Sequence, residues 1–433
     1  MHRALDSIRQ KFKRVHGPGS PLDLDYLVYC PDHRIHNLNA AALDLSRIVD
    51  AGQRDGLGQR IEQVLGGGIA HQEYGERVLA FFRQTFEIVP DIHAHLSQQE
   101  KAFTRLTGPL LQLLSGLEMR PLRLRILGTA GSGKSLIAHN FFRKAIASGK
   151  RPLLVCYNRP LGEKLRTLVP TGGMATTCHG FCDQFLKSRG IRPDYTDWAK
   201  VFDQVTGEPV PEEWKYDTLI VDEGQDFEPE WVEILRLFLR GDPDIVWLED
   251  PDQNVYDRPS VALSGFITFR AKVNYRTPRS IARAIQEKTT FDFEAGNPLP
   301  GLSVGETRYA DPADQPGLVA RLIESLLRQG FDHGEIALLT LRGVHHSIFS
   351  DRERVGNYRL RRFSGEYDLL GNQILTAGQI TFDSVRRFKG QQAPAIILVD
   401  CEAQNSSAPI SERLLYTGMT RATVRLEIVQ QNG

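Results

Sequence analysis

Short apolar runs alternate with amphipathic stretches through the middle of the chain. Largely apolar runs at 122–127, 152–156, 218–221 and 245–248 are separated by segments whose apolar positions lie three or four residues apart. Such runs predict buried strands, and the longer spacing predicts helices that cover them. The alternation from about residue 106 to 260 therefore predicts a mostly parallel sheet with helices on both faces.

The same alternation restarts in the second half. We expect strands at 266–273, 336–341, 374–377, 380–385, 395–399 and 424–429, and helices after Pro278, over 318–327 and over 414–422. The first hundred or so residues are less regular, with an amphipathic N-terminal helix, a strand at 24–29 and a helix at 76–86. The predicted division is an accessory α+β region (1–105) and two α/β domains (106–262 and 263–433).

Composition restricts the partners and the cellular location that we expect for the chain. The 53 basic residues equal the 53 acidic ones, so a nucleic-acid partner would need basic groups gathered on one face. No apolar run approaches the roughly 18 residues that span a bilayer, which argues against a membrane partner. The five cysteines are odd in number and scattered, which favours a reducing, cytoplasmic location over a disulfide scaffold.

A phosphate-binding loop follows the first of the apolar runs. The segment fits G-x-x-x-x-G-K-[ST] without a mismatch and consists of Gly128, Thr129, Ala130, Gly131, Ser132, Gly133, Lys134 and Ser135. Its glycines let backbone N–H groups face phosphate oxygens, and the helix that follows adds its N-terminus. Lys134 can reach the β- and γ-phosphates, and the Ser135 hydroxyl can bind Mg²⁺.

A pair of carboxylates follows the run at 218–221. Asp222 and Glu223 come directly after this predicted strand. In magnesium-assisted nucleotide hydrolysis, the first carboxylate can hold the metal and the second can deprotonate the attacking water. An isolated acidic pair is more often a solvated turn, but its place after a P-loop and a buried strand favours the catalytic interpretation.

Three other patterns are weaker metal-site candidates. They are the strand carboxylates Asp23 and Asp25, the C-x₂-H-x₂-H group Cys30, His33 and His36, and the group Cys178, His179 and Cys182. The first lacks the E-x-K of metal-dependent nucleases, and the other two do not complete a tetrahedral zinc site, so we favour structural roles. The arginine-rich segment 352–362 is either a solvated hairpin or a phosphate-facing patch.

The order of motifs over roughly residues 106–433 resembles superfamily 1 helicases of the UvrD/Rep type. GTAGSGKS resembles motif I, LLVCYNR motif Ia, TTCHGF motif Ib, VDEGQD motif II, EDPDQNVY motif III, NYRT motif IV, SVRRFKGQQ motif V and LLYTGMTRA motif VI. More closely, the chain is similar to compact UvrD-like ATPases often joined to a nuclease-related (NERD) domain. Residues 1–105 lie where such a domain would be.

This resemblance implies two RecA-like domains that bind ATP between them and single-stranded DNA across their tops. It implies that the P-loop and Gln253 bind the nucleotide, and that Ser135 and Asp222 hold Mg²⁺. The implied catalytic residues are Glu223, Gln225, Arg276 and Arg421. The implied nucleic-acid contacts are Asn158, Arg159, His179, Tyr256, Arg386 and Lys389.

The chain departs from the family pattern in several places. No aromatic residue follows Tyr256 shortly after motif III, so base stacking is absent or falls to Tyr256 itself. In motif V, Ser384, Arg386 and Gln392 replace the usual Thr, His and Glu. Gln112 has suitable spacing for the adenine-sensing glutamine without a matching context. The gaps between motifs Ib and II and between IV and V are too short for full accessory subdomains.

Three hypotheses follow. The first is a DNA-dependent ATPase that translocates on, and unwinds, DNA; RNA as the strand is not excluded. The second is a DNA-stimulated ATPase switch without processive unwinding, in repair or anti-phage defence. The expected protein partner is a nuclease or another repair or defence protein. The third is a P-loop enzyme that acts on a small molecule. Stimulation by single-stranded DNA separates the third from the other two.

Overall fold

The computed structural model describes residues 2–16, 22, 24–30, 34, 45–66, 75–79, 81, 92–194, 197–368, 373–401 and 409–432. The chain divides into two compact units, residues 1–88 and 89–433. Within the described residues, no helix is both long enough and apolar enough to cross a membrane.

The first unit contains little regular structure. Its elements are α1 (His2–His16), β1 (Val28–Cys30), β2 (Ile48–Asp50) and α2 (Leu57–Leu65), and the two strands pair in parallel. The predicted N-terminal helix is present. The Phe12 ring of this helix packs edge-on against the Phe81 ring, with 5.0 Å between the ring centres. Most of the predicted helix at 76–86 lies outside the described residues.

A six-stranded sheet forms the centre of lobe 1, the name used here for residues 116–271. Its strand order is β5-β4-β6-β7-β3-β8, and every pairing is parallel, as predicted. The strands are β3 (Arg123–Gly128), β4 (Pro152–Cys156), β5 (Met174–Thr177), β6 (Tyr216–Val221), β7 (Leu239–Glu249) and β8 (Ile267–Ala271). The helices are α5 (Lys134–Ala147), α6 (Arg159–Leu168), α7 (Cys178–Ser188), α8 (Trp198–Gly207) and α9 (Pro229–Arg236).

A second sheet forms the centre of lobe 2, residues 272–432. Its order is β11-β19-β18-β12-β17-β14-β13, parallel except for the final hairpin. The strands are β11 (Gly305–Tyr309), β12 (Ile336–Thr340), β13 (Arg354–Val355), β14 (Tyr358–Arg361), β17 (Ile380–Ser384), β18 (Ala393–Cys401) and β19 (Ala422–Gln431). The helices are α10 (Arg279–Lys288), α11 (Gln315–Arg328), α12 (Val385–Phe388) and α13 (Pro409–Met419).

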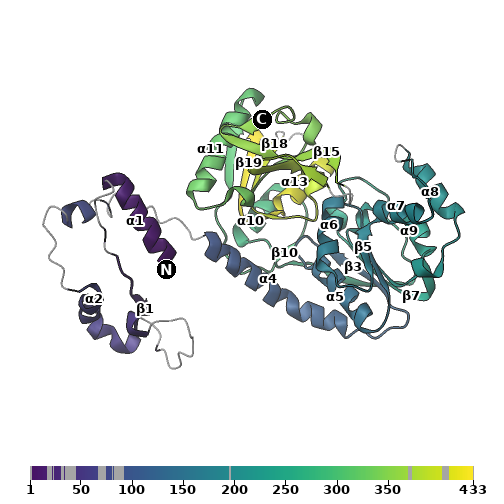
Figure 1. Ribbon diagram of the computed structural model, residues 1–433, viewed down its shortest axis with the longest axis horizontal. Coiled ribbons are helices and arrows are strands. Elements are labelled where there is room, and N and C mark those ends of the chain that lie inside the picture. Colours follow the sequence, from purple (N-terminus) through teal and green to yellow (C-terminus); the bar gives the residue numbers. More distant parts are fainter. Residues whose placement is uncertain are drawn as a thin grey trace. The chain divides into compact units, whose positions relative to one another are not determined.

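Two short strand pairs complete lobe 2. The pair β9 (Val273–Asn274) and β10 (Glu294–Ala295) is parallel, and the pair β15 (Phe363–Tyr367) and β16 (Gln373–Leu375) is antiparallel. The mixed α/β architecture with two mostly parallel sheets confirms the predicted fold class, two RecA-like domains. Figure 1 shows the two lobes in teal and in green to yellow.

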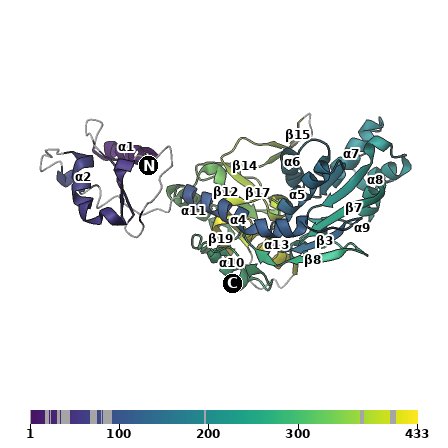
Figure 2. The same ribbon diagram turned by 90° about the horizontal axis from the view of Figure 1, so that it is seen from below.

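One long helix contributes to both lobes. Helix α4 (Ile92–Ser115) places Ile92 in the buried cluster of lobe 2 and Leu114 in the buried cluster of lobe 1. Figures 1 and 2 show α4 running along both lobes. The division of the chain at residues 105 and 262 remains a prediction. We note that 105 falls within α4 and that β8, beyond 262, pairs with β3 of lobe 1.

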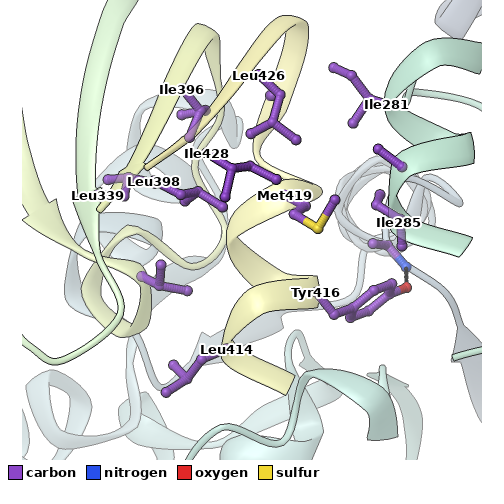
Figure 3. Packing of buried hydrophobic residues seen from close by; sticks show 14 of the residues in the cluster. Ile281, Ile285, Leu339, Ile396, Leu398, Leu414, Tyr416, Met419, Leu426 and Ile428 are labelled. Carbon is purple, nitrogen blue, oxygen red and sulfur yellow. Dashed lines mark hydrogen bonds between the residues drawn. The ribbon is translucent and has the colours of Figure 1, made fainter. Parts of the chain in front are cut away.

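The apolar core of lobe 2 extends to the P-loop. Tyr416 and Met419 of α13 belong to one buried cluster with Ile428 of the sheet and Ile285 of α10. Figure 3 shows Met419 beside Ile428 and the Tyr416 ring on the side of Ile285. Ala130 of the P-loop belongs to this same cluster. The Tyr416 hydroxyl also lies 2.8 Å from Thr129 Oγ1. The two lobes therefore meet at the loop that the sequence assigns to phosphate binding.

Candidate active site

The P-loop connects β3 to α5 and depends on glycine at two positions. Gly131 and Gly133 have φ angles of 72° and 95°, in the left-handed region that glycine adopts without strain. A Cβ on Gly131 would lie 2.3 Å from Asn274 Oδ1 of lobe 2. Gly131 therefore permits both the backbone turn and the close approach of the second lobe.

Lys134 turns back over this loop. Its Nζ donates to the carbonyl oxygens of Gly128 at 2.7 Å and Thr129 at 3.0 Å, and lies 3.5 Å from Asp250 Oδ2. The buried hydroxyl of Ser132 has no hydrogen-bond partner. A buried ammonium and a hydroxyl donor without an acceptor are both suited to an incoming phosphate.

The two predicted carboxylates follow β6. The Ser135 hydroxyl donates to Asp222 Oδ2 at 2.8 Å. Glu223 has a φ of 57°, unusual for a residue other than glycine, and its backbone N–H donates to Asp222 Oδ1 at 3.0 Å. Such backbone strain persists where surrounding contacts hold it, often at functional sites.

The surroundings of these carboxylates shift their pKa values in opposite directions. Burial, and then the neighbouring Glu223, raise the pKa of Asp222. Burial would also raise the pKa of Glu223, but the cations of Lys389, Lys134 and Arg421 outweigh it and lower that pKa. Glu223 is therefore ionised at neutral pH, as a general base must be.

Two glutamines link these carboxylates to the rest of the site. Gln225 Nε2 donates to Glu223 Oε2 at 2.6 Å, and its Oε1 accepts from the Asp250 backbone N–H at 2.9 Å. Gln253 donates to the Asp250 carboxylate through Nε2. Gln253 Oε1 accepts from the Arg421 guanidinium of lobe 2 at 3.0 Å. A continuous hydrogen-bonded chain thus runs from Glu223 to the second lobe.

Both predicted arginines of lobe 2 lie at this cleft. Arg421 is 2% exposed. Arg276 donates to Thr420 O at 2.9 Å and to Gln392 Oε1 at 3.5 Å, while its Nε has no hydrogen-bond partner. Burial, and then the Arg421 cation, lower the pKa of Arg276 to about 9, so Arg276 remains charged at neutral pH.

These groups surround one cavity of about 370 Å³. Lobe 1 contributes the P-loop, Glu223 and Gln253, and lobe 2 contributes Arg276 and Arg421. The rest of the wall is largely apolar and comes from α4, α5, α6 and motif V. It consists of Phe103, Leu136, His139, Leu161, Lys164, Leu165, Leu168, Gly390 and Gln392. The cavity thus joins a charged end, suited to phosphates, to an apolar end, suited to a base.

The residues predicted to hold Mg²⁺ are adjacent. The hydrogen bond between Ser135 Oγ and Asp222 Oδ2 brings a hydroxyl and a carboxylate oxygen together, the hard oxygen donors that Mg²⁺ prefers. Only these two protein groups are needed, because Mg²⁺ in nucleotide sites keeps several waters and binds substrate phosphates. The donor set therefore fits the ion.

Four of the six predicted nucleic-acid contacts lie on the seam between the lobes. Asn158 caps α6 and donates from Nδ2 to the carbonyl oxygens of Arg386 and Arg387 at 3.3 and 3.0 Å. The Tyr256 hydroxyl donates to the same Arg386 carbonyl at 3.3 Å. Arg386 itself and Lys389 are the other two of the four. The seam residues follow the carboxyl ends of their strands, where open α/β sheets bind ligands.

The remaining two residues, Arg159 and His179, belong to lobe 1 and lie beside aromatic rings, and the ring that Arg159 contacts belongs to lobe 2. The Arg159 guanidinium lies 3.9 Å from the centre of the Tyr367 ring. His179 lies edge-on to Trp198 and Trp231, with ring centres 4.3 and 4.7 Å apart. Burial, and then the Arg258 cation, lower the pKa of His179 to about 4, so this ring is neutral at pH 7.

Lys389 differs from the prediction for it. Its side chain is 0% exposed and donates to both Asp226 carboxylate oxygens, at 2.6 and 2.7 Å, instead of facing a surface. The family resemblance suggested a strand contact because motif V lies near the strand path. The buried Asp226 carboxylate, which sequence spacing did not connect to Lys389, provides the ammonium with its partner.

Sequence reasoning missed three features of the site. Helix α4 supplies Phe103 to the cavity. Its buried positions Ile92, Gln99, Thr107 and Leu114 repeat every seven or eight residues, but two of them are polar, so apolar periodicity does not show the repeat. Gln112, on the same helix, is exposed and is not among the residues that line the cavity. The contact of Tyr416 with Thr129 had no local signal.

Arg258 is the third missed feature. It stands shortly after motif III, where the family pattern has an aromatic residue that this sequence lacks. Its guanidinium lies 4.2 Å from the Tyr157 ring centre, 4.4 Å from Trp231 and 5.3 Å from Tyr256. The aromatic surface near motif III is therefore built by these three rings, and Arg258 covers it.

The structure describes only part of the three weaker metal patterns. Asp25 pairs with Arg47, whose hydrogen bond lowers the pKa of that carboxyl. Cys178 and Cys182 are buried on α7. Asp23, His33 and His36 lie outside the described residues. Among the residues that the structure describes, no group of three or more His, Cys, Asp or Glu side chains could hold a metal ion.

The arginine-rich segment forms the predicted hairpin, β13 and β14. Arg352, Arg354 and Arg359 are exposed, whereas Arg361 donates to Thr381 Oγ1 at 2.8 Å. Arg362 donates to the backbone carbonyls of Ser350 and Arg352. Arg354, although exposed, donates to the Asn357 carbonyl at 2.9 Å. Arg354, Arg361 and Arg362 therefore all help to hold the hairpin in place.

Among solved structures, the chain is similar to a viral helicase. The crystal structure of arterivirus nonstructural protein 10 (helicase) is 14% identical, with a TM-score of 0.32, over 71% of this chain and 59% of that chain. The present chain thus spans about 59% of the viral protein's length. A comparison with curated proteins gives no significant match.

Comparison with family models covers both lobes. Residues 118–259, which include the P-loop, Asp222 and Gln253, match an AAA domain. Residues 379–429, which include Lys389 and Arg421, match the UvrD-like helicase C-terminal domain. These two matches, in this order, confirm the predicted resemblance to UvrD-like superfamily 1 helicases.

Proposed function

We propose that the chain is an ATP-dependent DNA translocase or helicase of the UvrD-like type, which hydrolyses ATP between its lobes while bound to single-stranded DNA. One observation carries the proposal: Lys134 and Glu223 of lobe 1 and Arg276 and Arg421 of lobe 2 line a single cavity. Neither lobe alone supplies both the phosphate loop and the two guanidinium groups.

In this proposal the P-loop binds the triphosphate. Lys134 releases the carbonyl oxygens of Gly128 and Thr129 and pairs with the β- and γ-phosphates, and the partnerless Ser132 hydroxyl gains an acceptor. Ser135 and Asp222 would hold Mg²⁺, and the ion would supply positive charge beside the phosphate oxygens. The apolar end of the cavity, with Phe103 and Leu136, takes the base.

Glu223 acts as the base in hydrolysis. Its carboxylate accepts the proton of the attacking water, and the 2.6 Å hydrogen bond from Gln225 orients it. Arg276 and Arg421 stabilise charge on the transferring phosphoryl group from the opposite side, a contribution worth roughly 10³–10⁵ in rate in related P-loop enzymes. Gln253, which touches Arg421, transmits the state of the γ-phosphate.

Hydrolysis is coupled to the strand through the seam between the lobes. Asn158 and Tyr256 of lobe 1 both donate to the Arg386 carbonyl of lobe 2, beside the proposed strand path. A change in lobe closure during the ATP cycle alters these contacts. Each cycle then moves the two lobes relative to each other along the strand.

A DNA-stimulated switch without processive unwinding is the second candidate. It is supported by the short connections of both lobes. Between β5 and β6 lie α7, α8 and one 3₁₀ turn, and between β12 and β17 the described residues form short hairpin strands. Neither connection has room for the subdomains with which processive relatives separate strands.

The deciding experiment measures ATP turnover with and without single-stranded DNA across a salt series. We expect stimulation that weakens with salt, because phosphate contacts release counterions. Single-stranded RNA, tested alongside, decides the type of strand. Turnover that neither nucleic acid changes would instead support a P-loop enzyme acting on a small molecule.

Translocation and strand-displacement assays under the same conditions separate the first two candidates. Stimulated turnover with directed movement supports the translocase, and displacement of a paired strand extends it to a helicase. Stimulated turnover with neither movement nor displacement assigns the chain to the switch.

A further inference from the structure

Lys389 is a fully buried lysine that lobe 2 places inside lobe 1. It directly follows α12, and its side chain is 0% exposed. Its Nζ donates to Asp226 Oδ1 and Oδ2 at 2.6 and 2.7 Å and to Gln253 O at 2.8 Å. All of these acceptors belong to lobe 1.

This ion pair is complete and costly to bury. The three N–H donors of the ammonium meet three acceptors, and the Asp226 side chain is itself 0% exposed. Burial of two charges gains little stability over an apolar pair of similar size, so a buried ion pair is better explained by a specific role than by stability. The pair forms only when the lobes are together.

The ammonium lies beside the groups proposed to perform hydrolysis. Nζ is 3.6 Å from Glu223 Oε2, the oxygen that accepts from Gln225. Gln253, whose carbonyl oxygen accepts from Lys389, uses its side-chain oxygen to accept from Arg421. Lys389 therefore contacts both the Glu223 carboxylate and Gln253, the residue that accepts a hydrogen bond from Arg421.

The neighbouring glycine brings this segment close to lobe 1. Gly390 has a φ of 78°, and a Cβ there would lie 2.9 to 3.1 Å from atoms of the Leu161 side chain. Both Gly390 and Leu161 line the cavity. The approach of residues 389 and 390 is thus part of cavity formation.

We propose that Lys389 is a positioning residue for ATP hydrolysis, which lobe closure inserts between Asp226 and Glu223 so that Glu223 is oriented toward the attacking water. This inference rests on the proposed function and assigns Lys389 a role in the cleft in place of a strand contact. Before closure, Glu223 keeps only its contact with Gln225 and is less well oriented.

The test replaces Lys389 with methionine, which has a similar length and no charge. We expect Lys389→Met to lower kcat about 100-fold, the scale of a misplaced catalytic group. The KM for ATP and the affinity for single-stranded DNA without nucleotide should stay within about threefold, because Lys389 touches neither ligand. The salt dependence of DNA binding should not change.

Two results would overturn this inference. One is an unchanged kcat. The other is a loss of DNA affinity, with a salt slope smaller by about one, while kcat at saturating DNA is retained; that pattern identifies a phosphate contact. A wild-type chain without any ATP turnover is a separate result, because it contradicts the proposed function itself.

Two further variants guard against a folding defect. Lys288→Met removes a lysine that is 12% exposed and lies 2.7 Å from Glu306 in lobe 2, outside the cavity; equal loss of kcat there would overturn the inference. Asp226→Asn combined with Lys389→Met removes both buried charges. If Lys389→Met alone unfolds, the double variant decides: a low kcat with unchanged KM supports the inference, and a wild-type kcat overturns it.

Discussion

Single residues at the proposed site carry strain and burial that structural needs do not explain. Glu223 has a positive φ, Arg276 Nε and Ser132 Oγ have no hydrogen-bond partner, and Asp222 is 0% exposed. Each of these costs stability. Glu223 and Arg276 line the cavity, and Ser132 and Asp222 are sequence neighbours of residues that line it, an arrangement that suits a ligand site.

The first prediction concerns the proposed base. Glu223→Gln keeps the shape of the side chain but cannot accept a proton, so turnover should fall roughly 10²–10⁴-fold while ATP binding persists. Lys134→Ala should instead lose ATP binding. Steady-state turnover together with equilibrium nucleotide binding checks both variants. Normal hydrolysis by either one would remove that residue from the site.

The second prediction concerns acid sensitivity through His179. The folded-state pKa is about 4, below the ordinary 6.5, because the ring is buried beside the Arg258 cation. Above pH 6.5 both folded and unfolded forms are neutral. Between pH 6.5 and 4 the unfolded chain binds the proton more strongly than the folded chain, so stability falls as the pH falls, by about 3 kcal/mol in total.

Denaturant unfolding at pH 7, 6, 5 and 4 checks this prediction. His179→Phe retains an aromatic ring without the titrating nitrogen. We expect its free energy of unfolding to fall less between pH 6.5 and 4 than that of the wild type. Parallel pH dependences in the two proteins would show that His179 is not the group responsible.

At the scale of elements, the helix α4 connects the two lobes. Ile92 at its start packs in lobe 2, Phe103 lines the cavity, and Leu114 near its end packs in lobe 1. Gln99 accepts from Asn297 Nδ2 at 2.7 Å, and Asn297 also donates to the Arg276 carbonyl at 2.9 Å. The helix thus supports the segment that carries one of the two arginines.

The third prediction tests this packing with neighbouring leucines. Leu114 is 1% exposed, so Leu114→Ala should lower the free energy of unfolding by about 2–5 kcal/mol. Leu113 is 58% exposed, and Leu113→Ala should stay within about 0.5 kcal/mol of the wild type. Denaturant unfolding measures both. Equal effects would contradict the packing of α4 described here.

Elements whose signals are local could be predicted from the sequence. The strand at 152–156 was predicted with the bounds of β4, because an unbroken apolar run between polar residues has few alternatives. Helix α4 was missed because its buried face includes Gln99 and Thr107, which do not read as apolar. The pairing of β8 with β3 joins distant segments, and no local pattern indicates it.

At the scale of the whole molecule, the sequence indicates the motifs of the candidate site but not the contacts between the lobes. The P-loop and the carboxylates Asp222 and Glu223 are contiguous motifs, so their chemistry follows from spacing. The partners of Lys389 and Tyr416 lie in the other lobe, about 160 and 290 positions away along the chain. Such contacts depend on how two separately folded sheets pack, which periodicity does not encode.

Both lobes are needed for ATP hydrolysis in the proposed function. Lobe 2 contributes Arg276, Arg421 and Lys389 to a site whose phosphate loop and carboxylates belong to lobe 1. In the proposed function, a nucleic-acid strand that bridges the lobes controls hydrolysis through their separation. This is the central claim, and it predicts that a residue of lobe 2 can be essential for hydrolysis without being essential for nucleotide binding.

The most direct test is the ATP turnover of Arg421→Ala, measured with equilibrium ATP binding and saturating single-stranded DNA. The account predicts nucleotide affinity within about threefold of the wild type and a turnover reduced by roughly 10³ or more, because the guanidinium acts on charge that develops in the transition state. An unchanged turnover would contradict it, because the second lobe would then contribute nothing to the chemistry.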